Sequence, residues 1–164
     1  MKIGILSDTH GYLDNKVFEY FKNCQQVWHA GDIGTTTVTD ILKNRFELKA
    51  VYGNIDGTEL RKEFKEILCF EVEGKRILLT HIAGSFAKYN KNTADIIQSY
   101  KPDVLVCGHS HILKVAFDHK YNLLYINPGA AGTHGFHRVK TLIRFEIQNA
   151  QIKNMEVIEL GKRA

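Results

Sequence analysis

The sequence predicts an α/β protein, because short apolar strands alternate with helical segments along its first half. The second half changes to strands joined by tight turns, which indicates antiparallel hairpins. In both halves several strands end directly before an Asp, Asn or His. The 164 residues are 44% hydrophobic and 24% charged, a length and composition suited to one domain with a substantial core. We therefore expect a single domain over residues 1–164.

The first half alternates three expected strands with two expected helices. The strands are Ile3–Leu6, Gln26–Ala30 and Leu48–Tyr52, and the helices are Asp14–Cys24 and Thr35–Arg45. In the second helix Val38, Ile41 and Leu42 are expected to point inward. Strands separated by helices pair in parallel through right-handed crossovers. The turns after the three strands should therefore lie at the same edge of the sheet.

The second half is expected to contain three hairpins, one helix and one further strand. The hairpins pair Cys69–Val72 with Arg76–Thr80, Lys114–His119 with Leu123–Ile126, and Leu142–Ile147 with Ile152–Ile158. The helix is Thr93–Tyr100, which ends before Pro102, and the strand is Val104–Cys107. We find no internal repeat and no segment with the composition of a linker.

Charge and cysteine content exclude several classes of protein. The net charge of +4 comes from scattered Lys and Arg with acidic residues among them, so a nucleic-acid partner is not expected. No stretch approaches the roughly 18 apolar residues of a membrane span, and no signal peptide is evident at the start. The chain has three cysteines, Cys24, Cys69 and Cys107. Their number is odd, they lack Cys-x-x-Cys spacing, and each lies in an apolar context. We expect buried thiols in a cytoplasmic protein.

Seven side chains with nitrogen or oxygen donor atoms lie within a residue or two of predicted strand ends. They are Asp8, His10, Asp32, Asn54, His81, His109 and His111. This edge of an open α/β sheet is where ligands bind. Seven donors are too many for one tetrahedral zinc and too few for a calcium cage. Two metal ions that share one carboxylate are therefore expected, with Asp32 as the bridge. Manganese is favoured, and nickel, zinc and iron stay open.

Five motifs in this order resemble the calcineurin-like metallophosphoesterases, in particular their small YfcE-type phosphodiesterase branch. The motifs are Asp8-x-His10, Gly31-Asp32, Gly53-Asn54-x-Asp56, His81 and Gly108-His109-x-His111, within a match from Lys2 to about Gly129. The resemblance implies two mixed β-sheets packed together and flanked by helices. It also implies two metal sites, one made by Asp8, His10, Asp32 and His111 and the other by Asp32, Asn54, His81 and His109.

Such a site hydrolyses phosphate esters. Two metal ions lower the pKa of a bridging water, so that hydroxide forms near neutral pH, and they clamp the phosphoryl oxygens for in-line attack. The resemblance therefore implies a hydrolase with a small-molecule phosphate ester as substrate. A phosphodiesterase is favoured over a phosphomonoesterase.

The residue that protonates the leaving group is not identified by the motifs. Many members of the family have a histidine after the Gly-Asn pair, where this chain has Ile55. Asn54 and Asp56 are the catalytic candidates in this loop, although Asp56 is also placed to fix the loop. His134 and His137 are the further candidates.

Other positions leave their roles open. Arg138 suits either a substrate phosphate or a surface ion pair, while His29 and His119 match no motif and are expected to be structural. The segment Ile82-Ala83-Gly84 replaces a Gly-His pair that is frequent in the branch, so the rim of the substrate pocket is expected to differ.

A non-catalytic scaffold is the competing hypothesis. The retromer's vacuolar-sorting scaffold subunit has a similar fold and size but serves as a protein-binding platform. Every ligand position of the active pattern is present in this chain, which favours an enzyme. A nuclease would be expected to show a basic groove and usually an added domain. Assembly into a homo-oligomer stays open.

Overall fold

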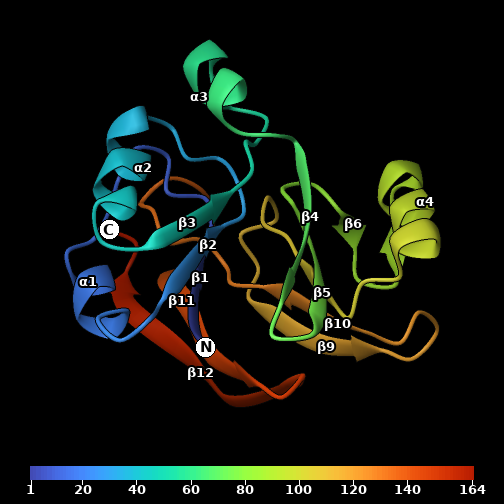
Figure 1. The fold of residues 1–164 in the computed structure, drawn as a ribbon. Coiled ribbons are helices and arrows are strands. Elements are labelled where there is room, and N and C mark those ends of the chain that lie inside the picture. Colours follow the sequence, from blue (N-terminus) through green and yellow to red (C-terminus); the bar gives the residue numbers. More distant parts are fainter.

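Two five-stranded β-sheets pack face to face in the computed structural model, which describes residues 1–164 (Figure 1). The first sheet, in spatial order, consists of β12 (Gln151–Lys162), β11 (Val139–Gln148), β1 (Lys2–Leu6), β2 (Gln26–His29) and β3 (Glu47–Ala50). The second consists of β4 (Ile67–Val72), β5 (Lys75–Thr80), β8 (Val104–Val106), β10 (Leu123–Asn127) and β9 (Lys114–Asp118). A small hairpin of β6 (Gly84–Ser85) and β7 (Lys88–Tyr89) lies apart from both.

Both sheets are mixed. In the first sheet β1, β2 and β3 run parallel, as the alternation of strands and helices predicts, and β11 joins β1 in the antiparallel sense. In the second sheet β5, β8 and β10 run parallel, while β4 and β9 pair antiparallel at its two edges. The expectation of two mixed sheets flanked by helices is therefore confirmed.

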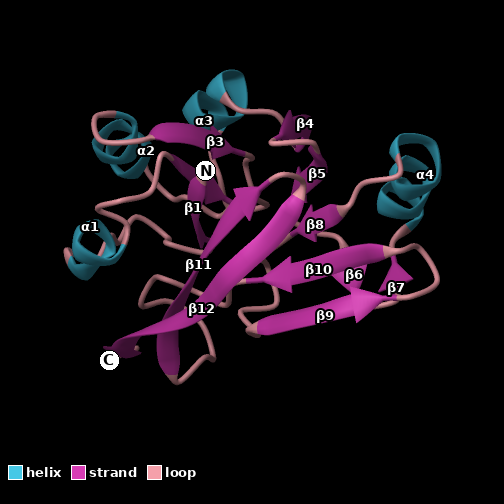
Figure 2. Ribbon diagram, turned by 60° about the horizontal axis from the view of Figure 1, so that its bottom comes forward, coloured by secondary structure: helices cyan, strands magenta, loops and turns pink.

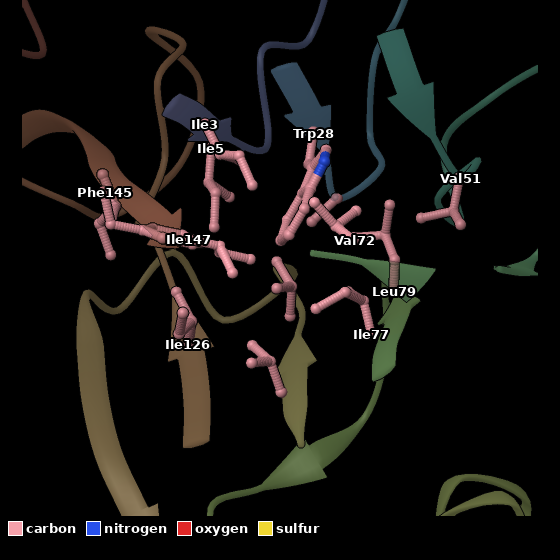
Figure 3. Packing of buried hydrophobic residues seen from close by; sticks show 14 residues of the cluster. Ile3, Ile5, Trp28, Val51, Val72, Ile77, Leu79, Ile126, Phe145 and Ile147 are labelled. Atoms are coloured by element: carbon pink, nitrogen blue, oxygen red, sulfur yellow. The ribbon is translucent and has the colours of Figure 1, made fainter. Parts of the chain in front are cut away.

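The main core lies between the sheets (Figure 3). Residues of β1, β2 and β11 meet residues of β5, β8 and β10 there. Trp28 lies at its centre, edge-on to Phe70 and to Phe145, with ring centroids 5.2 and 5.7 Å away. Alternate residues along a strand face opposite sides of a sheet, so Ile77 and Leu79 join this core while Leu78 faces outward.

Helices cover the outer faces of both sheets (Figure 2). Residues of α1 (Lys16–Tyr20), α2 (Thr36–Lys43) and α3 (Thr58–Glu63) pack in a cluster with Leu6 and Val27 of the first sheet. The helix α4 (Lys91–Tyr100) places Ile97 against Leu78 and Leu105 of the second sheet. Because both faces of β1 and β8 are buried, these two strands are almost continuously apolar. No helix combines the length and the apolar character needed to cross a membrane.

Several expectations about individual elements are wrong. The first helix is five residues long, because a turn at residues 21–23 ends it before β2 begins at Gln26. Ile41 is 38% exposed, because the short α2 turns Val38 and Leu42 inward and leaves Ile41 at the side. Cys69 is exposed, whereas Cys24 and Cys107 are buried as expected. The helix α3 and the hairpin of β6 and β7 are not anticipated by the sequence pattern.

Candidate functional site

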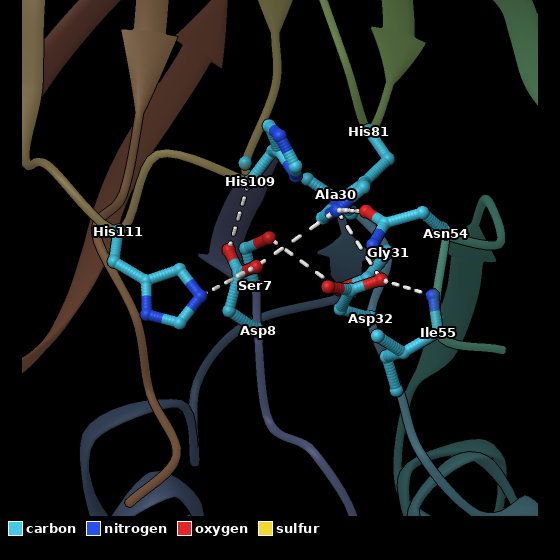
Figure 4. A network of polar contacts seen from close by, with 12 residues as sticks. Ser7, Asp8, Ala30, Gly31, Asp32, Asn54, Ile55, His81, His109 and His111 are labelled. Carbon is cyan, nitrogen blue, oxygen red and sulfur yellow. Dashed lines mark hydrogen bonds and ion pairs between the residues drawn. The ribbon is translucent and has the colours of Figure 1, made fainter. Parts of the chain in front are cut away.

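All seven predicted donor residues gather where the strand ends of the two sheets meet, and Figure 4 labels all of them except His10. The loops after β1, β2 and β3 of the first sheet carry Asp8, His10, Asp32 and Asn54. The loops after β5 and β8 of the second sheet carry His81, His109 and His111. The first sheet thus supplies both carboxylates and the amide, and the second supplies three of the four imidazoles. The convergence expected from the sequence is observed.

Asp8, His10 and His111 form the first group that could hold a metal ion. Their ligand atoms lie within 4.8 Å of one another. Asp8 Oδ1 is 3.2 Å from His111 Nε2, and the Asp8 side chain is fully buried. Asp8 Oδ1 and His10 Nε2 are buried without any hydrogen-bond partner. Burying such groups unpaired is costly, so these atoms fit a bound cation.

Asp32, His81 and His109 form the second group, with ligand atoms again within 4.8 Å of one another. Asp32 Oδ1 lies 3.2 Å from His81 Nε2, and Asn54 Oδ1 lies 3.1 Å from the same nitrogen. The other Asp32 oxygen is 3.7 Å from His10 Nε2, in the first group. The Asp32 carboxylate therefore faces both groups, as a bridging ligand would.

The surroundings of the His81 ring also favour a bound positive charge. Its Nδ1 lies 2.7 Å from the Ala30 carbonyl oxygen, which only an N–H can approach favourably. Neutral His81 therefore turns an unprotonated Nε2 toward two oxygens. Burial acts to lower the pKa of His81, but its hydrogen bond with Asp32 and the charges of Asp8 and Asp32 outweigh it and raise the pKa. A proton on His81 Nε2, or a metal ion between this nitrogen and the two oxygens, would remove the unfavourable contact.

His137 orients His111. The Nε2 of His137 lies 2.8 Å from the Gly132 carbonyl oxygen and so carries the proton. Its Nδ1 therefore accepts from Nδ1 of His111 at 3.2 Å. This leaves Nε2 of His111 unprotonated and directed at Asp8, which is the form that binds a metal. Burial, with a smaller contribution from His111, lowers the pKa of His137 and so favours its neutral form.

Backbone strain is concentrated at the same residues. Five of the seven donors adopt the left-handed conformation, with φ from 48° to 68°: Asp8, His10, Asp32, His109 and His111. Such conformations each cost on the order of 1–3 kcal/mol and cluster at functional sites. The site also needs a glycine, because a Cβ at Gly53 would overlap the Asp32 carboxylate.

The carboxylate of Asp56 is engaged by backbone groups. It accepts hydrogen bonds from the N–H of Gly53 at 2.7 Å, Gly34 at 2.8 Å and Ile33 at 3.1 Å. These bonds join the loop after β3 to the loop after β2. The geometry favours the positioning role of Asp56, and it gives no support to Asp56 as the proton donor.

The remaining histidines differ in their surroundings. His134 is exposed, and its ring lies over that of His10 with centroids 4.8 Å apart. His119 is exposed, and its ring lies edge-on to that of Phe117, with centroids 5.0 Å apart. His29 is fully buried and contacts Thr9, inside the Asp8-x-His10 motif. The sequence pattern does not place His29 or Thr9 in the site, because only the fold brings them together. Arg138 is exposed, and the structure gives it no side-chain partner.

The model of the calcineurin-like phosphoesterase superfamily domain matches residues 1–150 of this chain. The chain belongs to this superfamily. Two proteins of Methanocaldococcus jannaschii, named a phosphodiesterase and a probable metallophosphoesterase, are each 32% identical to it. Each match spans 79% of this chain, and they cover 83% and 68% of the two relatives respectively.

Solved structures of similar fold include both an enzyme and a sorting protein. A structure described as a novel archaeal phosphodiesterase aligns with a TM-score of 0.78 at 26% identity, over 98% of this chain and 100% of that one. Vps29 of Entamoeba histolytica, solved with zinc, aligns with a TM-score of 0.72 at 18% identity, over all of both chains. The second likeness shows the shared fold alone. The chain is thus a metallophosphoesterase by family.

Proposed function

We propose that this protein is a metal-dependent phosphodiesterase with a dinuclear site and a small-molecule phosphate ester as substrate. The observation that carries the proposal is the pair of donor groups that share Asp32, whose oxygens lie 3.2 Å from His81 Nε2 and 3.7 Å from His10 Nε2. Membership of the superfamily and the phosphodiesterase among its relatives support the reaction class. Two divalent ions, manganese in our proposal, supply an acidified water and neutralise charge on the phosphoryl oxygens.

We assign the residues to two sites. Asp8, His10, Asp32 and His111 hold one ion, and Asp32, Asn54, His81 and His109 hold the other. The contacts of His81 with Ala30 and of His111 with His137 fix the tautomers that leave Nε2 free in both rings. The donor set of imidazole, carboxylate and amide, without thiolate, suits manganese, nickel, zinc or iron.

His134 is our proposed proton donor to the leaving group. Among the candidates, Asp56 and His137 already use their polar atoms within the protein, whereas His134 is exposed beside His10. An alkoxide needs this proton far more than p-nitrophenolate does, because it is the stronger base. His134→Ala should therefore slow hydrolysis in which methoxide is the leaving group at least 100-fold. It should change hydrolysis in which p-nitrophenolate leaves less than 5-fold. Equal effects on both would remove His134 from this role.

A non-catalytic scaffold is the second candidate, and the similarity of fold to Vps29 favours it. The two hypotheses differ in one measurement. Metal-stripped protein is supplied with manganese, nickel, zinc or magnesium and assayed with bis(p-nitrophenyl) phosphate and with p-nitrophenyl phosphate. We expect diester turnover that returns with metal, disappears in Asp32→Asn and persists in Asp95→Asn, a control on α4. Dominant monoester turnover would correct the substrate, and no turnover with any metal would favour the scaffold.

A further inference from the structure

A cavity of about 440 Å³ lies directly beside the second donor group and has no part in the function proposed above. One wall is the segment after His81, from Ile82 to Phe86, and the other is Gly108 to Ser110 with Ile112. Lys114 and Tyr125, from β9 and β10, complete it. Its volume is within the roughly 300–1,000 Å³ of small-molecule sites. A group bound there would be adjacent to His109.

The lining suits a flat apolar group. Ile82 and Ile112 leave 42% and 66% of their surface exposed beside an otherwise polar centre. The half-buried ring of Phe86 packs edge-on against Tyr125, with centroids 5.5 Å apart. Lys114 Nζ lies 4.8 Å from the centroid of the Phe86 ring. No lining residue is acidic, so an aromatic ring with an anionic phosphate attached meets no negatively charged side chain within the cavity.

Both walls are held in place before any ligand arrives. Asn90 donates from Nδ2 to the Ile82 carbonyl oxygen at 2.8 Å, and its backbone N–H donates to Ala83. In the opposite wall, Ser110 Oγ accepts from Asn127 Nδ2 at 3.1 Å and from the Ile112 N–H at 3.2 Å. Pre-formed walls reduce the entropy lost on binding.

We propose that this cavity binds an aromatic substituent of the substrate, the one that stays on the phosphate when the other ester bond is broken. The inference rests on the phosphodiesterase function and narrows it to aryl or nucleoside-like esters. The cavity borders His109, whereas the proposed proton donor His134 lies over His10 in the other donor group. The retained group and the departing group are thereby placed on different sides of the phosphate.

Two esters with the same leaving group test this directly: phenyl p-nitrophenyl phosphate and methyl p-nitrophenyl phosphate. Stacking and burial of a ring favour the bound state, so wild-type kcat/KM should be at least about 5-fold higher for the phenyl ester. Phe86→Ala should bring the ratio close to one by lowering the rate of the phenyl ester. Phe117→Ala, a control on β9 outside the cavity, should leave the ratio unchanged. Equal rates in wild type, or a ratio insensitive to Phe86→Ala, would overturn the proposal.

A binding measurement separates this proposal from the catalytic one. Phenyl phosphate and methyl phosphate are titrated into manganese-loaded protein by calorimetry. Tighter binding of phenyl phosphate that Phe86→Ala abolishes would support the cavity even if no ester were turned over. Equal binding of the two phosphates would reject the cavity even in an active phosphodiesterase.

Discussion

At the scale of single residues, several side chains outside the seven donors hold the site in shape. His29 is buried, and its Nδ1 accepts from the Gly31 N–H at 3.2 Å. Its Nε2 therefore carries the proton and donates to Thr9 Oγ1 at 2.9 Å, and Thr9 donates onward to the Ile33 carbonyl oxygen. This chain of hydrogen bonds ties the Asp8-x-His10 turn to the loop after β2, and it requires neutral His29.

The pH dependence of stability should report this requirement. Burial lowers the pKa of His29 from 6.5 to about 4. Below pH 6.5 His29 becomes protonated in the unfolded chain, whereas in the folded protein it stays neutral until about pH 4. The free energy of unfolding that neutral His29 contributes therefore falls as the pH drops. Between pH 7.5 and 5 the loss should be about 2 kcal/mol. In urea unfolding of metal-free protein, the stability gap between wild type and His29→Gln should narrow by that amount. Parallel pH profiles would contradict this assignment.

His137 provides the second test at this scale. His137→Phe removes the acceptor for Nδ1 of His111 while it keeps a ring of similar size. Loss of such an outer partner typically weakens metal binding 10–100-fold. We expect about a 10-fold increase in the Kd for manganese, measured by calorimetry. His119→Phe, at an exposed histidine away from the site, should leave the Kd unchanged. An unaltered Kd in His137→Phe would show that the contact does not orient His111.

At the scale of elements, the parallel strands place the loops, and Asp56 holds two loops together. Its three backbone hydrogen bonds link residues after β2 and β3, beside Asp32 and Asn54. Hydrogen bonds to buried charged groups contribute about 1.5–3 kcal/mol each. Asp56→Asn keeps the side-chain volume but replaces one acceptor oxygen with an NH2 group. It should lower the free energy of unfolding, measured in urea, by about 3 kcal/mol.

The same variant distinguishes positioning from proton donation. If Asp56 only positions Asn54, Asp56→Asn should lower the rate of hydrolysis by the same factor whether methoxide or p-nitrophenolate leaves. It should also weaken manganese binding. A selective effect on the methyl group would restore Asp56 as the proton donor. Asp118→Asn, at a buried carboxylate that accepts from Tyr89, controls for the loss of a buried charge.

Elements could be predicted from the sequence where their pattern is strong. The strands β1 and β8 are nearly continuous apolar runs, and the turn at Glu73 and Gly74 marks a hairpin. The helix α3 buries only Leu60, so it has no amphipathic period to detect. Ile41 shows a second limit, since the inward face of a short helix depends on what it packs against. The donor residues were predictable because each follows a strand, whereas the partners of His29 and Asp56 come from other loops.

At the scale of the whole molecule, the donor groups span the contact between the two sheets (Figure 4). Asp8 and Asp32 come from the first sheet and His81, His109 and His111 from the second. Local patterns predict each sheet, but the packing of one on the other follows from the shared core around Trp28. Sequence periodicity does not carry that information, and only the resemblance to a known family indicated it.

Metal binding should therefore stabilise the whole fold. Manganese at 100 times its Kd adds about 2.7 kcal/mol, which for this size corresponds to a rise in Tm on the order of 8 °C. Asp8→Asn should lose most of this rise. Without metal, the same variant should unfold at or above the wild-type temperature, since it removes a buried carboxylate whose Oδ1 has no partner. A metal-induced rise in Tm as large in Asp8→Asn as in wild type would contradict the assignment of Asp8 as a ligand.

The division of ligands between the sheets also has a kinetic consequence. Neither sheet alone presents a complete set of donors, so a chain in which only one sheet has formed cannot bind the ion with native affinity. Metal should then leave the rate of folding almost unchanged and slow the rate of unfolding, because the bound state exists only after the sheets have docked. The lifetime of the native protein, rather than the speed with which it forms, would follow the supply of metal in its surroundings.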